Sequence, residues 1–213
     1  CGRITVLDFD TFPSKPEEQL ALVKFRVKKS VPYDIDSAAV TYAVQSHSGK
    51  KHEVVALVVS LEIVQRYEGP FRAAGLHPGL VTTASITSLD LVRQPGVSVA
   101  VRLAGRQMAV SVIDGGSLKL VRCVELPDLT PEEVEGVLVP TLAYIEDELG
   151  KKPERMVTCG FGAMTQEWDW QPDFGLSVEP LRSRFGAPGE TNAGLYGWIE
   201  GSLHGIPSQE VAA

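Results

Sequence analysis

Hydrophobic and polar residues alternate along Arg3–Phe9 (RITVLDF) with the period of two that is typical of a β-strand. The same period returns in Ala38–Gln45 and Glu53–Ser60, and the polar stretch His47–Lys50 joins these two runs. Short polar connections that contain glycine are typical of hairpin tips. This part of the chain therefore predicts three strands, two of which form a hairpin.

A helical period appears twice in the same part of the chain. The first predicted helix begins at Ser14–Glu17 (SKPE), which resembles a capping box, and it ends before Pro32. The second has Ser60 as its N-cap, runs to about Ala74 and ends at Gly75, because glycine readily adopts the left-handed conformation that follows a helix. Strands and helices are thus mixed from the start.

The next stretch predicts a short strand over Leu80–Ala84 and a short helix over Thr87–Arg93. Gln94–Gly96 (QPG) follows, and its Pro-Gly pair is the clearest break in the whole pattern. We therefore place a domain boundary there, with residues 1–95 in one domain and residues 96–213 in the other.

Five short strands are predicted after this boundary. Val97–Cys123 contains three of them, with tight turns at Ala104–Arg106 and Asp114–Gly116. Met156–Cys159 and Ser177–Leu181 have the apolar or alternating character of further strands.

Two helices separate and follow these later strands. Thr130 begins the first one as an N-cap, with Glu133 as its reciprocal partner, and Gly150 ends it. Pro140 lies inside this helix and is expected to kink or break it. Thr191–Leu203 predicts a final helix with regularly spaced glycines. The order of the elements indicates an α/β fold built in layers.

The composition is that of an ordinary globular protein, with 44% hydrophobic and 22% charged residues. A net charge of −7 argues against nucleic acid as a partner. No apolar run approaches the roughly 20 residues of a membrane span, so we expect no direct membrane insertion. The three cysteines are few and unevenly spaced, which favours free thiols in a reducing compartment. We find no metal-ligand spacing and no catalytic constellation, and we predict neither a metal site nor catalytic residues.

Five stretches, taken in order, resemble the PilM family of type IV pilus assembly proteins, which are actin-like ATPases related to the cell-division protein FtsA. Lys28–Asp36 (KKSVPYDID) resembles the element that follows a helix in the family, and Val54–Pro78 resembles its strand and helix ending in AAGL-x-P. Val99–Arg122 resembles the second phosphate-binding hairpin, and Cys159–Ala163 (CGFGA) the glycine motif that contacts adenosine. Asn192–Gly197 resembles the closing helix.

The resemblance covers nearly the whole chain and implies an α/β fold with the RNase H-like lobes of an actin-like ATPase. In these terms residues 1–95 are a small inserted α+β domain with the end of the first lobe, and residues 96–213 are the second lobe. We find no first phosphate hairpin before Arg3, so we expect the fold to be N-terminally incomplete. The implied function is that of a cytoplasmic scaffold, peripheral at the inner membrane, in the type IV pilus assembly platform.

The phosphate hairpin lacks the chemistry that the resemblance requires. A working hairpin needs a carboxylate to hold magnesium and a glycine that lets the backbone approach phosphate. The carboxylate position falls on Arg102, which cannot bind a cation. Gly105 and the motif residues Gly160, Gly162 and Ala163 keep the backbone freedom for residual nucleotide contact. We therefore predict a degenerate nucleotide site in a protein that is not an enzyme and needs no cofactor, with ATP binding left open for the intact protein.

The resemblance also implies a partner, the short cytoplasmic tail of a membrane-anchored PilN-like protein. A peptide tail needs an apolar groove with a charged rim, for which we predict Tyr33 and Ile35 with Lys24 and Lys28. Whether the chain forms homo-oligomers is left open. Two other functions also stay open: an actin-like ATPase that gates pilus or secretion-system assembly, and a divergent sugar-kinase-like enzyme. The ATPase needs an acidic residue in the phosphate loop, and the kinase-like enzyme needs a catalytic acid. The sequence offers a recognisable candidate for neither.

Overall fold

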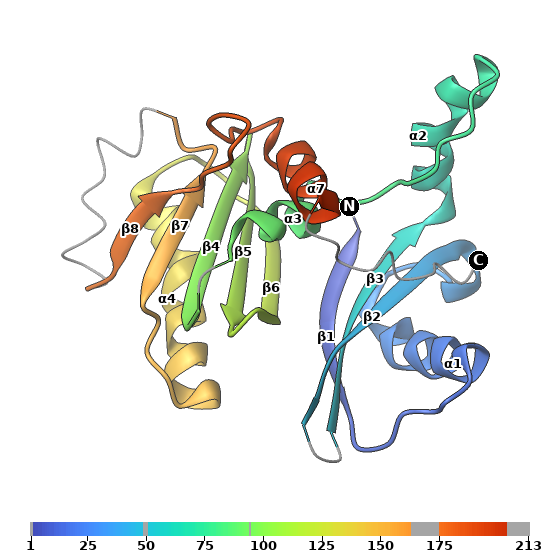
Figure 1. Cartoon of the computed structure of the whole chain (residues 1–213), viewed down its shortest axis with the longest axis horizontal. Helices are drawn as coiled ribbons and strands as arrows, with labels where there is room; N and C mark the ends of the chain where they lie inside the picture. Colours follow the sequence, from blue (N-terminus) through green and yellow to red (C-terminus); the bar gives the residue numbers. More distant parts are fainter. Residues whose placement is uncertain (1, 49–50, 94, 163–174, 204–213) are drawn as a thin grey trace. The chain divides into compact units, whose positions relative to one another are not determined.

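The computed structural model describes residues 2–48, 51–93, 95–162 and 175–203, and it divides the chain into two compact units at Thr83 and Ala84. Each unit has its own sheet (Figure 1). Each also has its own apolar core. The division precedes the Pro-Gly break because the short helices α3 (Ala84–Thr87) and η3 (Ser88–Leu91) pack on α7 (Ala193–Leu203), which belongs to the second unit.

The N-terminal unit is built on an antiparallel sheet with the strand order β1-β3-β2. The strands are β1 (Arg3–Phe9), β2 (Ala38–Ser48) and β3 (Lys51–Ser60), so the three strands predicted here are confirmed. Helix α1 (Pro16–Val27) packs on β2 and β3 and buries two valines in the core. The buried core residues are Phe9, Val23, Val27, Ile35, Ala38, Val40, Val54, Ala56 and Val58.

The ends of α1 differ from the sequence prediction. Lys15 is its N-cap and makes no side-chain cap hydrogen bond, so the capping box predicted from Ser14 is wrong. Pro16, at the first helical position, starts the helix without needing an N–H partner. Two short 3₁₀ turns, η1 (Lys28–Ser30) and η2 (Ile35–Ser37), then lead into β2.

Helix α2 (Leu61–Ala73) follows β3 directly and ends at Gly75, as predicted, with a φ of +75°. None of its side chains is buried. The strand predicted over Leu80–Ala84 is wrong: this stretch is exposed or half-buried, forms no strand, and ends where α3 begins. No strand of the described residues lies beside it to pair with.

The C-terminal unit is built on a five-stranded mixed sheet with the order β6-β5-β4-β7-β8. The strands are β4 (Val97–Ala104), β5 (Gln107–Asp114), β6 (Ser117–Glu125), β7 (Arg155–Cys159) and β8 (Ser177–Pro180). The first three form an antiparallel meander, whereas β4 pairs with β7, and β7 with β8, in parallel. All five strands predicted in this part of the chain are confirmed.

Helix α4 (Pro131–Leu149) covers one face of this sheet, and α3, η3 and α7 cover the other (Figure 1). Thr130 is the N-cap of α4 and accepts a hydrogen bond from the N–H of Glu133, and Gly150 ends the helix in the left-handed conformation. Both predictions are confirmed. Pro140 does not break α4, which is one continuous helix. None of the helices in the described residues is long and apolar enough to cross a membrane.

Candidate functional site

The turn between β4 and β5 lies where the sequence predicts a phosphate-binding hairpin. The two strands pair up to Ala104 and Gln107, so Gly105 and Arg106 alone form the turn. Gly105 has a φ of +54°, a left-handed conformation that glycine adopts without strain. The predicted hairpin is confirmed, and its tip is exposed.

The glycine motif after β7 lies at the same end of the sheet. β7 runs parallel to β4 and pairs Cys159 with Arg102, so that Gly160 comes next to Leu103. A Cβ atom added to Gly160 would lie 1.9 Å from the carbonyl oxygen of Leu103. Gly160 therefore has to be glycine for packing, whether or not a ligand binds.

Three of the four residues predicted to contact nucleotide thus gather at one end of the sheet. Gly105 follows β4, and Gly160 and Gly162 follow β7, where Gly162 is exposed and has a φ of +54°. Ala163 lies outside the described residues. Contact of these residues with a nucleotide stays a prediction.

Sequence reasoning missed Glu190, which meets the turn directly. The backbone N–H of Gly105 donates a 2.6 Å hydrogen bond to Oε1 of Glu190. Nη2 of Arg102 donates a 2.7 Å hydrogen bond to the backbone carbonyl oxygen of Glu190. No local signal could have revealed these contacts, because 85 residues separate Gly105 from Glu190.

The residue before Glu190 is held by two further contacts. The carbonyl oxygen of Gly189 accepts a 3.5 Å hydrogen bond from Sγ of Cys159. The backbone N–H of Gly189 donates a 2.6 Å hydrogen bond to Oδ1 of Asn192. Burial raises the pKa of the Cys159 thiol, and the nearby Arg102 guanidinium opposes this rise. The thiol is therefore protonated at neutral pH and serves as a donor.

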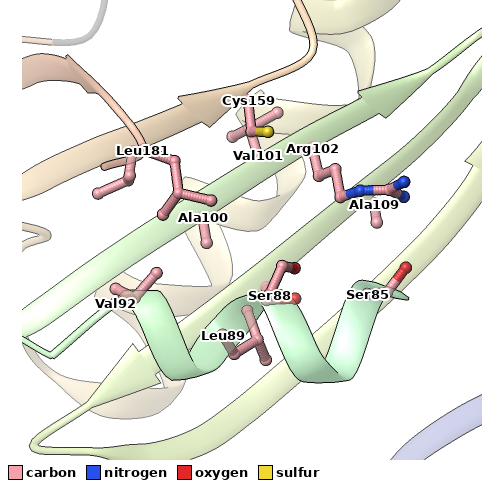
Figure 2. A pocket seen from close by; sticks show the side chains of 12 residues that line it. Ser85, Ser88, Leu89, Val92, Ala100, Val101, Arg102, Ala109, Cys159 and Leu181 are labelled. Atoms are coloured by element: carbon pink, nitrogen blue, oxygen red, sulfur yellow. The ribbon is translucent and has the colours of Figure 1, made fainter. Parts of the chain in front are cut away.

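A small cavity lies between η3 and the sheet, beside this end of β4 and β7 (Figure 2). Ser88, Ala100, Arg102 and Cys159 are among its lining residues. Its volume is about 10 Å³, which is room for roughly one water molecule. Sites for small organic ligands usually measure about 300–1,000 Å³, so this cavity is not a nucleotide site.

The residues at this end of the sheet do not fit a magnesium–phosphate group. None of the residues from Arg102 to Met108 has a carboxylate side chain. The carboxylate of Glu190 occupies the backbone N–H of Gly105 that a phosphate would use. Within the described ranges, no group of three His, Cys, Asp or Glu side chains is arranged to hold a metal ion.

The four residues predicted to bind a partner all lie in α1 or between α1 and β2, but their exposure differs. Lys28 is exposed, whereas Lys24 and Tyr33 are half-buried. Burial raises the pKa of the Tyr33 hydroxyl, and the nearby Ser60 backbone opposes this rise. Ile35 is only 5% exposed and belongs to the core. Its side chain therefore packs inside the unit and cannot form the predicted contact with a partner.

No family model matches the chain, and no curated protein sequence matches it. Solved structures do match. PilM in a structure of the "PilM-PilN type IV pilus biogenesis complex" has a TM-score of 0.66 at 14% identity, covering 97% of this chain and 77% of that one. A Bacteroides thetaiotaomicron protein with an actin-like ATPase fold and unknown function has a TM-score of 0.50 at 13% identity, covering 84% and 64%.

The cytoplasmic domain of EpsL, an inner-membrane component of the Vibrio cholerae type II secretion system, matches with a TM-score of 0.46 at 12% identity. This match covers 73% of the chain and 56% of the EpsL domain. At these identities the matches describe the fold and leave the activity open. The chain is an α/β protein with an actin-like ATPase fold, and it is similar in structure to PilM.

Proposed function

We propose that this protein is a cytoplasmic scaffold of a type IV pilus assembly platform, peripheral at the inner membrane, that binds the tail of a PilN-like protein. The observation that carries the proposal is the match to PilM over 97% of the chain, at a TM-score of 0.66, in a structure that contains PilM with PilN. The proposal includes no catalytic step and no bound cofactor.

The chemistry of the β4–β5 turn supports a scaffold rather than an ATPase. Arg102 stands at the position of the magnesium-holding acid, and Glu190 uses the N–H of Gly105. Both features are unfavourable for a metal–nucleotide complex, because a cationic side chain repels the metal and a carboxylate repels phosphate. A scaffold requires neither ligand.

The N-terminal unit offers the surface on which a tail would dock. The outer side of α1 and the turn that follows it are basic, and their cationic residues are Lys24, Arg26, Lys28 and Lys29. Arg26 lies over the ring of Phe9, with its guanidinium carbon 5.2 Å from the ring centroid. A tail with apolar and acidic residues would contact the Tyr33 ring and this basic rim.

The test is a fluorescence-anisotropy titration of a labelled synthetic peptide, the cytoplasmic tail of a PilN protein, with the whole chain. We expect saturable binding that Tyr33→Ala weakens, because the variant removes an apolar contact, and that Tyr33→Phe preserves. Lys28→Glu should weaken binding about three- to tenfold, the usual range for a charged rim residue. Ile35→Ala is unsuitable as a test of the docking surface, because removing a buried side chain from the core costs about 2–5 kcal/mol of stability.

The matched control is Lys152→Glu, which makes the same charge change at an exposed lysine of the C-terminal unit. If Lys152→Glu weakened binding as much as Lys28→Glu, the attraction would be non-specific and the docking surface would be wrong. Absence of saturable binding, or binding equal to that of a scrambled peptide, would reject the proposed partner.

The alternative, an actin-like ATPase that gates assembly, is tested on the same protein by measuring phosphate release from Mg-ATP. The proposal predicts no release above the background of the heat-denatured chain. Turnover that rises in proportion to the protein concentration would favour the ATPase instead.

A further inference from the structure

The β4–β5 turn donates its backbone N–H to a carboxylate of the same chain. Gly105 is the donor, Glu190 is the acceptor, and the two atoms are 2.6 Å apart. Backbone N–H groups at a left-handed glycine in a tight turn are groups that commonly bind phosphate or carboxylate anions. The turn is therefore already engaged with an anion.

Arg102 adds a cation to the same contact. Its Nη2 atom holds the backbone carbonyl oxygen of Glu190 at 2.7 Å. Its Nε atom is buried and has no hydrogen-bond partner among the described residues. What the guanidinium brings to the turn is therefore positive charge, held in place through Nη2.

The position of Glu190 is fixed by its neighbours rather than by chance. Cys159 and Asn192 hold Gly189, the residue immediately before it, and α7 begins immediately after Asn192. A tethered carboxylate competes for a neighbouring N–H at a high effective concentration, whereas a free anion has to arrive from solution. Two anions near one donor also repel each other.

We propose that the β4–β5 turn is an anion site that the chain fills with its own Glu190 carboxylate, so that phosphate groups are excluded from it. The inference goes beyond the scaffold function and does not rest on it, because every residue involved lies in the C-terminal unit. Removing the carboxylate should leave the Gly105 N–H free to bind phosphate, with the positive charge of Arg102 close to it.

The test is an NMR titration of the ¹⁵N-labelled whole chain with inorganic phosphate at constant ionic strength, following the Gly105 amide resonance. In the wild type we expect only a small, non-saturating shift. In Glu190→Ala the resonance should move with saturation, and adding Arg102→Ala to this variant should weaken the response. Glu190→Gln retains a neutral acceptor, which competes less well than the carboxylate, so its response should lie between those of the wild type and Glu190→Ala.

Glu146→Ala is the control, because it removes the same charge from an exposed position on α4; it should behave as the wild type does. Saturable binding with the same midpoint in the wild type and Glu190→Ala would show that Glu190 excludes nothing, and the proposal would fail. A well-dispersed spectrum of either Glu190 variant with no response at Gly105 would show that the turn is not an anion site. Neither result bears on binding of the tail peptide, which uses the N-terminal unit.

Discussion

At the scale of single residues, Gly160 shows how a missing side chain allows two strands to meet. A Cβ atom there would lie 1.9 Å from the Leu103 carbonyl oxygen, and the φ of +84° is strained for any other residue. Gly160→Ala should therefore lower the free energy of unfolding by about 3 kcal/mol or more, because a backbone clash adds to backbone strain. Urea denaturation followed by circular dichroism measures the loss.

Gly162→Ala is the matched control for this prediction. Gly162 has a similar left-handed φ of +54°, but no heavy atom of the described residues lies within 4 Å of the position of its Cβ. Its substitution should therefore cost only the strain, about 1–2 kcal/mol. Equal losses in the two variants would show that the approach of Gly160 to Leu103 is not important for stability.

Glu200 is a nearly buried carboxylate in α7 whose two hydrogen bonds hold a neighbouring turn. Its Oε1 atom accepts from Oγ of Ser183 at 2.6 Å and from the N–H of Arg184 at 2.9 Å. The hydrogen bond from Ser183 is the main cause that lowers the pKa of Glu200 below its ordinary value of 4.5. The carboxylate should therefore stabilise the protein above about pH 4.5 and lose this effect as the pH falls through the lowered pKa.

Glu200→Gln should thus be about 1–3 kcal/mol less stable than the wild type at pH 7, the usual value of a charge-assisted hydrogen bond. The difference should shrink on acidification to pH 3, because the stabilisation is lost as the pH falls below 4.5 towards the lowered pKa of the wild-type carboxyl. Urea denaturation at both pH values, with Glu146→Gln as an exposed control, tests this. A difference that stays constant with pH would mean that the charge contributes nothing.

At the same scale, the sequence predicted residues whose role depends on backbone conformation but missed those that meet across the fold. Gly75, Gly105 and Gly160 mark the ends of helices and strands, and such glycines can be recognised from their immediate neighbours in the sequence. The contacts of Glu190 with Arg102 and Gly105 arise only when α7 has packed on the sheet. Ile35 was predicted as a surface residue because the local pattern does not show which face of the short 3₁₀ turn is covered.

At the scale of elements, α7 packs on α3 and η3 through glycines. A Cβ atom on Gly197 would lie 1.9 Å from the carbonyl oxygen of Thr87, and one on Gly201 would lie 2.5 Å from Oδ2 of Asp90. The helices approach closely because these positions lack side chains. The regular glycines seen in the sequence are thus explained by packing.

Gly197→Ala should lower the free energy of unfolding by about 1–3 kcal/mol, as overpacking usually does, although alanine is the better helix former. Gly136→Ala in α4 is the matched substitution in open space, since no atom in the part of the chain that the structure describes lies within 4 Å of its Cβ position. It should raise stability by about 0.5–1 kcal/mol through helix propensity alone. If urea denaturation shows that Gly197→Ala lowers and Gly136→Ala raises the free energy of unfolding, the packing argument is supported. An increase in both variants would overturn it.

The elements that were predicted well are those with a long pattern and a clear end. Strands β4 to β6, and α4 between Thr130 and Gly150, combine strong periodicity with well-defined turns or caps. The strand predicted over Leu80–Ala84 failed because an apolar run becomes a strand only beside a partner strand. The start of α1 was misplaced by one residue, because Ser14 was expected to cap the helix and Lys15 occupies the N-cap position instead.

At the scale of the whole molecule, the two units have separate cores. The C-terminal core gathers on the α4 side of its sheet and includes Leu138 and Ile145, both fully buried. The N-terminal core, which includes Val54 and Val23, lies between α1 and its own sheet. Damage to one core should therefore remain in its own unit.

Leu138→Ala should destabilise the C-terminal unit by about 2–5 kcal/mol, because it leaves a cavity in a fully buried position. Hydrogen exchange measured by mass spectrometry should show faster exchange in β4 and β5 and unchanged exchange in β3. Equal loss of protection in both units would show that they unfold together.

The parallel pairing of β4 with β7 has a consequence for the time course of folding. The strands of the N-terminal unit include an antiparallel hairpin, β2–β3, that closes over a short connection. In contrast, β4 obtains its second neighbour only after β5, β6 and α4 have been synthesised, because β7 follows all of them in the chain. Long-range parallel contacts form late, so one side of β4 stays unpaired on the ribosome until β7 emerges, and chaperones would find their target at that edge.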